Sequence, residues 1–263
     1  MIYVLQALWK REIIKFVRDR SRLIGALAQP VVFWLLLGLG FQRSFTFPAA
    51  ASAASDASIN YLEYLFPGTI ALMILFTAIF STISIVEERK SGFLQAALIA
   101  PVSRSAFVLG TTLGGTSLSL FQTLLLLLLL PFIGLIPSIP GILIMVLVCF
   151  LTGLAFTALG VAIAWTMETT RGFHAIMNLF LLPLWILSGA FFPYEGASTV
   201  LQWCIKLNPV SYAVDALRIG MYMPDPSPGT LQPLAISLLI SAVFAALMIG
   251  VAVWVIRKPM FKG

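Results

Sequence analysis

Charged residues are scarce in this 263-residue sequence. Only 10% of the residues are Asp, Glu, Lys or Arg, whereas about 25% is usual in soluble domains, which need a polar surface. Hydrophobic residues make up 60% of the chain, and its mean hydropathy is +1.02. Polar side chains therefore cannot cover this protein in water, and we expect a bilayer to surround most of it.

Residues that commonly carry out chemistry are also few. There are two cysteines, Cys149 and Cys204, and a single histidine, His174, with no cluster at metal-ligand spacing. We expect the two cysteines at different membrane depths, which excludes a disulfide between them. No lysine follows a glycine, so the Gly-Lys-Ser/Thr sequence of a phosphate-binding loop is absent. We expect no catalytic residue, no metal site and no cofactor in this chain.

Six stretches are long and apolar enough to cross a bilayer, which takes about 20 residues. They are residues 23–41, 65–86, 106–130, 139–165, 173–192 and 231–256. The first apolar run is longer than a signal-peptide core, so we expect it to be retained. The interiors of the six stretches contain no Asp, Glu, Lys or Arg, which argues against an ion-coupled carrier. The expected fold is an all-α integral membrane protein with one transmembrane domain over residues 1–263.

The distribution of positive charge predicts the orientation. Thirteen of the 16 Lys and Arg residues fall in four segments, 1–22, 87–105, 166–172 and 257–263. Positive residues prefer the cytosolic side, so we expect both termini there. The net charge of +6 then reflects topology and attraction to anionic lipid headgroups. No soluble basic face suited to nucleic acid is evident.

Residues 1–22 combine basic side chains with apolar ones at helical spacing. The pattern predicts an amphipathic helix that lies in the membrane interface; a generic membrane anchor is the alternative. The apolar positions are Val4, Leu5, Leu8, Trp9, Ile13, Phe16 and Val17.

Small residues recur at helical spacing in the third and fourth spans, where they let helix backbones approach closely. One set is Gly110, Gly114 and Ser117, and the other is Gly153, Thr157, Gly160 and Ala164. Polar residues on the third span, namely Thr112, Thr116, Ser119, Gln122 and Thr123, leave open a polar pathway, although helix packing is the simpler interpretation.

The outer segment 193–230 is the longest non-spanning stretch. Its two halves are apolar enough to be buried but too short to span, and Asn208-Pro209 separates them. This pattern predicts two short re-entrant helices before the last span, because helices satisfy their own backbone groups in hydrocarbon.

The inner loop 87–104 reads "EERKSGFLQAALIAPVSR". Its residues 93, 94, 97 and 98 are apolar and predict one stripe on a short helix. Pro101 ends that helix, and Ser103 is suited to cap the next one. Such a helix can lie in the groove of a partner protein or rest on lipid. Charges at its flanks could form ion pairs at the rim of a partner.

This loop resembles the one between spans two and three in permease subunits of type-2 ABC transporters. A second stretch, "LSGAFFPYEGASTVLQWCIKLNPVSYAVDALR" at residues 187–218, is similar to the family's hallmark before the sixth span. The family includes exporters of drugs, of nodulation lipo-oligosaccharides and of polysaccharides. The resemblance covers essentially the whole chain, and the hallmark is closest to that of the drug exporters.

The resemblance implies a transport subunit without enzymatic activity of its own, in a bacterial cytoplasmic membrane. Two ATPase subunits would bind ATP and Mg, and a second permease copy or a paralogue would complete twelve spans. The implied substrate is amphipathic, drug-like or lipid-linked; export of polysaccharide or glycolipid, an ion-coupled carrier and a membrane scaffold are the alternatives.

The resemblance also assigns residues. Segment 87–100 would be the coupling helix, and the residues expected to meet the ATPase are Glu87, Glu88, Arg89, Lys90, Gly92, Phe93, Leu94, Ala97, Leu98, Pro101 and Arg104. The residues expected at the outer gate, in the re-entrant region, are Pro193, Tyr194, Asn208, Pro209 and Tyr212.

Overall fold

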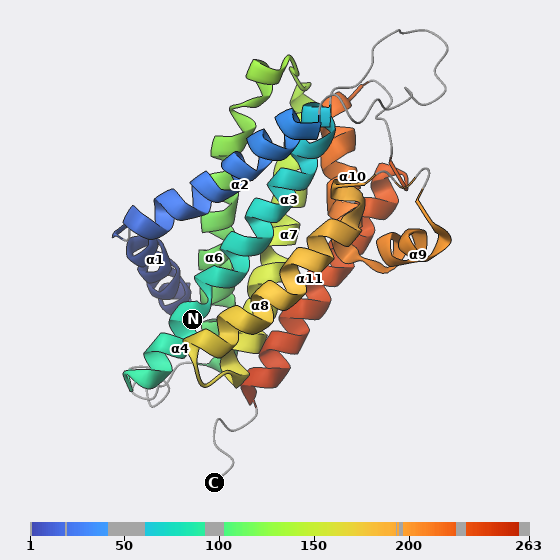
Figure 1. The fold of residues 1–263 in the computed structure, drawn as a ribbon. Helices are drawn as coiled ribbons and strands as arrows, with labels where there is room; N and C mark the ends of the chain where they lie inside the picture. Colours follow the sequence, from blue (N-terminus) through green and yellow to red (C-terminus); the bar gives the residue numbers. More distant parts are fainter. Residues whose placement is uncertain are drawn as a thin grey trace, which may run out of the picture.

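The computed structural model describes residues 2–18, 20–41, 61–92, 103–192, 194, 197–224 and 230–257, and within these ranges the chain is helical without strands (Figure 1). The helices are α1 (Ile2–Arg18), α2 (Arg20–Phe41), α3 (Tyr61–Ser81), α4 (Ile83–Lys90), α6 (Arg104–Leu127), η1 (Leu130–Ile133), α7 (Ile139–Thr166), α8 (Thr170–Trp185), η2 (Ile186–Ala190), α9 (Thr199–Leu207), α10 (Pro209–Tyr222) and α11 (Leu234–Arg257). The all-α prediction is confirmed.

Five helical stretches of the described chain are long and apolar enough to cross a membrane. They are Tyr61–Lys90, Arg104–Ile133, Ile139–Thr166, Thr170–Ala190 and Leu234–Arg257, and they match the second to sixth expected spans. The first expected span lies in α2, whose apolar part is Pro30–Phe41, so a count of six stays a prediction. Two short helices, α9 and α10, occupy the outer segment as expected; their insertion into the membrane also stays a prediction.

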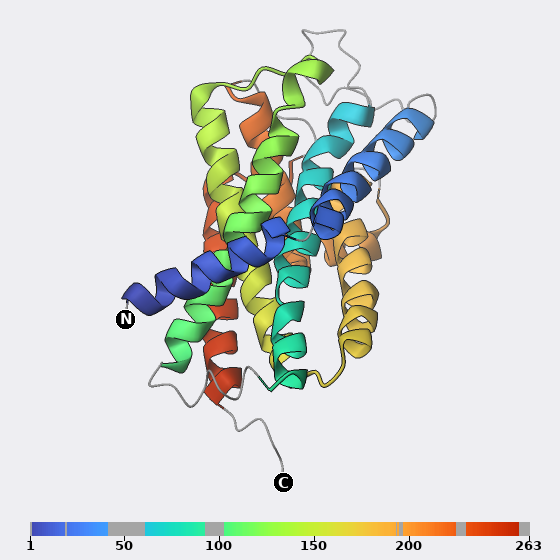
Figure 2. The same cartoon turned by 90° about the vertical axis from the view of Figure 1, so that its left-hand side faces the viewer.

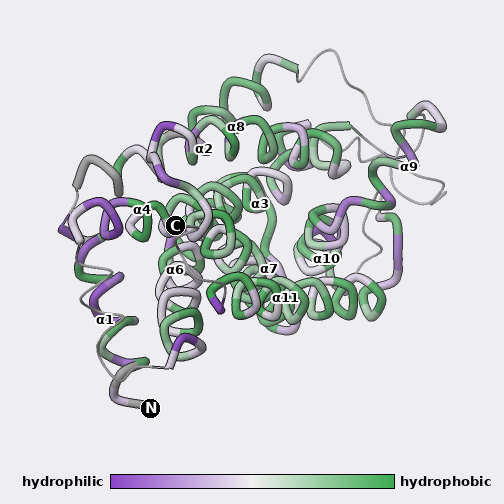
Figure 3. The backbone as a smooth tube through the Cα atoms, turned by 90° about the horizontal axis from the view of Figure 1, so that it is seen from below, coloured by the Kyte–Doolittle hydropathy of each residue, from purple (hydrophilic) through white to green (hydrophobic). Residues whose placement is uncertain are grey.

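Helix α3 forms the centre of the bundle. Nearly all of its side chains are buried, and it packs against α2, α6, α7, α8 and α10. An apolar helix that is buried all round belongs in a protein core. By contrast, α11 packs along α7 and leaves much of its surface exposed. Figure 3 shows that the hydrophilic segments gather on α1, α4 and a few connections, while the long helices are mostly hydrophobic.

Small residues bring α3, α6 and α7 into close contact. A Cβ atom on Gly153 of α7 would lie 2.8 Å from Ser119 Oγ of α6, and one on Gly160 would lie 2.7 Å from Thr82 Oγ1. The predicted role of the second set of small residues in helix packing is therefore confirmed. All five polar residues of the suggested pathway are buried inside the chain, and Gln122 accepts a hydrogen bond from Thr77 of α3. They line contacts between α6 and its neighbours.

The first set of small residues seats the amphipathic helix α1. Gly110 lies under Leu8, and a Cβ on Gly114 would lie 2.7 Å from the Cβ of Glu12. The indole of Trp9 donates a hydrogen bond to Ser117 Oγ at 2.9 Å. Figure 2 shows α1 lying across α6 at a steep angle to the long helices. The helix expected in the interface thus also packs on protein, along a groove formed by small residues of α6.

This groove generates the first prediction. Gly114→Leu should displace α1, because the new side chain would occupy the space of Glu12, and such overpacking costs about 1–3 kcal/mol. We expect trypsin to cleave α1, which contains Lys10 and Lys15, about tenfold faster. The control is Gly250→Leu, since nothing lies within 4 Å of a Cβ at Gly250. Equal cleavage of the two variants would contradict this packing.

Candidate functional site

The helix that leads to the expected coupling segment is interrupted at Thr82. The Ser81 and Thr82 hydroxyls donate to the carbonyl oxygens of Ala78 and Ile79, each at 2.7 Å. Hydroxyl groups that bond the preceding turn compete with the helical ladder and bend helices. Helix α4 then begins at Ile83 and continues to Lys90, four residues beyond the expected end of the span at 86, because glycine first occurs at Gly92.

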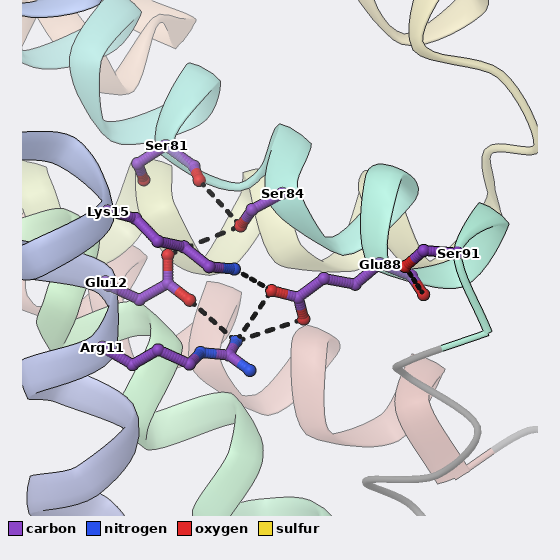
Figure 4. A network of polar contacts seen from close by, with 7 residues as sticks. All are labelled: Arg11, Glu12, Lys15, Ser81, Ser84, Glu88 and Ser91. Atoms are coloured by element: carbon purple, nitrogen blue, oxygen red, sulfur yellow. Dashed lines mark hydrogen bonds and ion pairs between the residues drawn. The ribbon is translucent and has the colours of Figure 1, made fainter. Parts of the chain in front are cut away.

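A buried carboxylate on α4 connects this helix to α1 (Figure 4). Arg11 Nη2 lies 3.1 Å from both carboxylate oxygens of Glu88, and Lys15 Nζ pairs with the same group. Arg11 also pairs with Glu12 at 2.9 Å, and Ser84 Oγ donates to Glu12 at 3.4 Å. Glu12 and Glu88 are only 5% and 7% exposed. The network holds α1 and α4 together at one end of the bundle.

Two arginines of the loop region bind backbone carbonyls at the ends of other helices. Arg89 donates to Met167 O at 2.8 Å and to Trp165 O, where α7 ends. Arg104 donates to the carbonyl oxygens of Ile256 and Arg257 at 3.1 and 2.9 Å, at the end of α11. The last carbonyls of a helix lack partners within it, and a cation there also meets the negative end of the helix dipole.

Of the eleven residues expected to meet an ATPase, three thus make contacts within the chain. Glu87 and Lys90 are exposed on α4, and Gly92 has a φ of +74°, a left-handed conformation that suits glycine after a helix end. Ser103 caps α6 by accepting a hydrogen bond from Ala106 N at 3.2 Å, as predicted. Five of the eleven expected residues lie outside the described residues: Phe93, Leu94, Ala97, Leu98 and Pro101. Their role stays a prediction.

The expected outer residues surround the junction of α9 and α10. Asn208 Oδ1 accepts from Val210 N at 3.0 Å, which caps α10, while its Nδ2 donates to Leu184 O of α8. Pro209 follows as the first residue of α10, where a missing N–H costs nothing. Tyr212 donates to Lys206 O at 2.7 Å. The Lys206 ammonium lies over the Tyr194 ring. Pro193 lies outside the described residues.

Sequence reasoning missed a pair of buried charges on α10. Asp215 and Arg218 are each only 2% exposed. Asp215 accepts a hydrogen bond from Leu231 N at 3.0 Å, just before α11. Burial raises the pKa of Asp215 to about 7, although Arg218 and two backbone N–H groups act to lower it. The available signal was an acidic and a basic residue three positions apart on an otherwise apolar helix.

Comparison with known proteins identifies the family. The ABC-2 type transporter model matches residues 3–222. This chain belongs to the ABC-2 type transporter family. A protein named as a transport permease, ycf38, of Cyanophora paradoxa is 26% identical over 219 residues, 82% of this chain and 73% of that protein. Nodulation protein J of Sinorhizobium fredii (strain NBRC 101917 / NGR234) is 27% identical over 218 residues, 82% of this chain and 80% of that protein.

The ABC-2 permease is therefore a multi-pass membrane component for transport. Members of its family generally work with an ABC ATPase subunit. In the described part of the chain, no three His, Cys, Asp or Glu side chains gather in a way that could hold a metal ion. What the described site can do is mechanical: Glu88 and Arg89 join α4 to α1 and to the end of α7, and Arg104 joins α6 to the end of α11.

Glu88 generates the second prediction. Glu88→Gln removes the charge that Arg11 and Lys15 share, and hydrogen bonds to charged groups contribute about 1.5–3 kcal/mol. We expect a lower thermal midpoint of the purified permease and faster tryptic cleavage of α1. Glu87→Gln is the matched control, because Glu87 is exposed one residue earlier. If both variants behave like the native chain, the network does not hold α1.

Asp215 generates a pH prediction. Its folded pKa of about 7 exceeds the value near 3.9 of an unfolded Asp, so only the folded state binds this proton between those values. Its contribution to the free energy of unfolding is present below about pH 4 and is lost as pH rises through about 7. We expect the thermal midpoint to fall between pH 5.5 and pH 8. The fall should be smaller in Asp215→Asn; an equal fall in both proteins would assign it to another group.

Proposed function

We propose that this ABC-2 permease is the transmembrane subunit of an ATP-driven exporter in a bacterial cytoplasmic membrane. Six spans with both termini in the cytosol would form half of the path, and a second permease would supply the other half. A separate ATPase, present in two copies, would bind ATP and Mg. The substrate would be amphipathic, drug-like or lipid-linked.

The Glu88 network is the observation that supports this proposal most directly. Glu88 lies at the start of the expected coupling segment 87–100, and its carboxylate is shared by two cations of α1. A partner that displaces residues 93–100 would therefore move α4 and α1 together. Because α1 lies in the groove of α6, the displacement would also reach a spanning helix. Such rigid-body transmission suits a subunit that is driven from outside.

The exposed charges next to this network fit a partner surface. Glu87 and Lys90 project from α4 and are exposed, so they remain available for ion pairs at the rim of an ATPase cleft, where charges give register more than affinity. The buried Glu88 and the carbonyl-binding Arg89 would keep α4 in place while the partner binds.

Replacing the expected apolar contact is the third prediction. Phe93→Asp with Leu94→Asp should uncouple ATP hydrolysis from transport, because two carboxylates cannot enter an apolar cleft without a large desolvation cost. We expect transport in proteoliposomes to fall to background while the permease still inserts. Ser91→Asp, which adds charge at an exposed neighbouring position, is the control. Unchanged substrate-stimulated ATPase activity and flux in the double variant would refute the docking assignment.

A pull-down in gentle detergent tests the partner directly. The tagged permease should retain a soluble ATPase in stoichiometric amount, and the Phe93→Asp, Leu94→Asp variant should lose it. Mass spectrometry identifies what remains bound. A preparation without a nucleotide-binding partner, under conditions that keep known complexes whole, would favour an ion-coupled carrier or a scaffold. Transport that stops when the proton gradient collapses, while ATP stays high, would select the carrier.

A further inference from the structure

The last turn of α8 leaves the α-helical pattern in η2. Within Ile186–Ala190, Leu187 has φ −83° and ψ +16°, and Gly189 has φ +73°. This irregular turn leaves carbonyl groups without their usual partners within the helix. The Gly189 carbonyl oxygen accepts a hydrogen bond from the Tyr64 hydroxyl at 2.9 Å and from Arg218 Nη2 at 3.4 Å. One carbonyl group therefore joins α3, η2 and α10.

The Arg218 guanidinium is covered by aromatic and charged neighbours. Its central carbon lies 4.3 Å from the centroid of the Tyr64 ring, a cation–π contact. Tyr64 is 5% exposed and Arg218 is 2% exposed, so this contact is desolvated. Asp215 lies one turn earlier on the same helix and holds Leu231 N. The same cluster thus extends to the segment that enters α11.

Close packing surrounds this cluster. A Cβ on Gly68 of α3 would lie 2.6 Å from the Cβ of Ala190, and the Trp185 indole donates to Gly68 O at 2.6 Å. Ser188 is 1% exposed within η2. The contact between α3 and η2 therefore has no room for a side chain, and a small reagent can reach Ser188 only if the helices separate.

A buried charge is a poor source of stability, because an apolar residue of similar volume often does as well. The directional contacts of the Arg218 guanidinium are either formed or broken, so they can distinguish two conformations of the protein. We propose that the contact of Tyr64 and Arg218 with the Gly189 carbonyl is a latch that holds the outer ends of α3, α8 and α10 together, and that it opens to release substrate. The release step rests on the proposed function; the latch itself does not.

The test measures how fast a thiol in η2 reacts. Ser188→Cys places a nearly isosteric, buried thiol there, in a background with Cys149→Ala and Cys204→Ser. The full-length permease is placed in nanodiscs, where a charged methanethiosulfonate reagent reaches both faces of the membrane. Tyr64→Phe then removes one hydroxyl but keeps the ring under Arg218.

We expect Tyr64→Phe to raise the labelling rate about three- to tenfold, because a hydrogen bond contributes about 0.5–1.5 kcal/mol and each 1.4 kcal/mol is a factor of ten. Thr166→Val is the matched control: it removes a hydroxyl that also bonds a backbone carbonyl, but at an exposed position at the end of α7. Equal labelling rates in Tyr64→Phe and Thr166→Val would overturn the latch.

Native membranes with and without MgATP separate the latch from the exporter proposal. If MgATP accelerates labelling of the Ser188→Cys thiol, and Tyr64→Phe reproduces that acceleration without MgATP, latch and ATP-driven opening both stand. Faster labelling from Tyr64→Phe without any response to MgATP supports the latch and counts against ATP-driven opening. A response to MgATP with no effect of Tyr64→Phe overturns the latch alone.

Discussion

This bundle depends on hydrogen-bond donors for the backbone carbonyl groups at the ends of its helices. The last carbonyls of a helix have no partner within it, and hydrocarbon offers none. Here three arginines from other helices provide the missing donors. Arg89 bonds the end of α7, Arg104 bonds the end of α11, and Arg218 bonds Gly189 in η2. A planar guanidinium with several donors suits this task better than an ammonium group. In a chain with so few charges, three arginines therefore fix helix ends relative to each other.

These contacts form two clusters at opposite ends of α3. The hydroxyl of Tyr64 belongs to the cluster around Gly189, and α4, which continues α3 beyond Thr82, carries Glu88 of the cluster with α1. The intervening helix is buried on nearly all sides. The middle of α3 is therefore held by close packing, while both of its ends are also held by directional bonds. A conformational change that keeps the packing would act on the ends.

The helices themselves were predictable, because long uncharged runs and a capping serine are local signals that need no knowledge of the fold. The junction of α9 and α10 at Asn208 was predictable for the same reason. The partners of Glu88, Arg89 and Arg104 were not, since they lie 73 to 153 residues away in the chain. The spacing of Gly110 and Gly114 predicted a close helix contact, but it did not identify α1 as the helix that makes this contact. The burial of Asp215 and Arg218 depends on elements far apart in the sequence, among them α3, η2 and the segment before α11, which no single window of sequence reveals.

Helix α1 is held on the bundle by two kinds of contact that respond differently to ionic strength. The apolar contact of Leu8 with the glycine groove persists in salt, whereas Lys15 is partly exposed and its attraction to Glu88 is screened as ionic strength rises. The salt concentration of an extraction buffer therefore changes how strongly α1 is held against the bundle. Preparations made in dilute and in concentrated salt therefore differ in how strongly α1 is attached. Their activities should be compared at matched ionic strength.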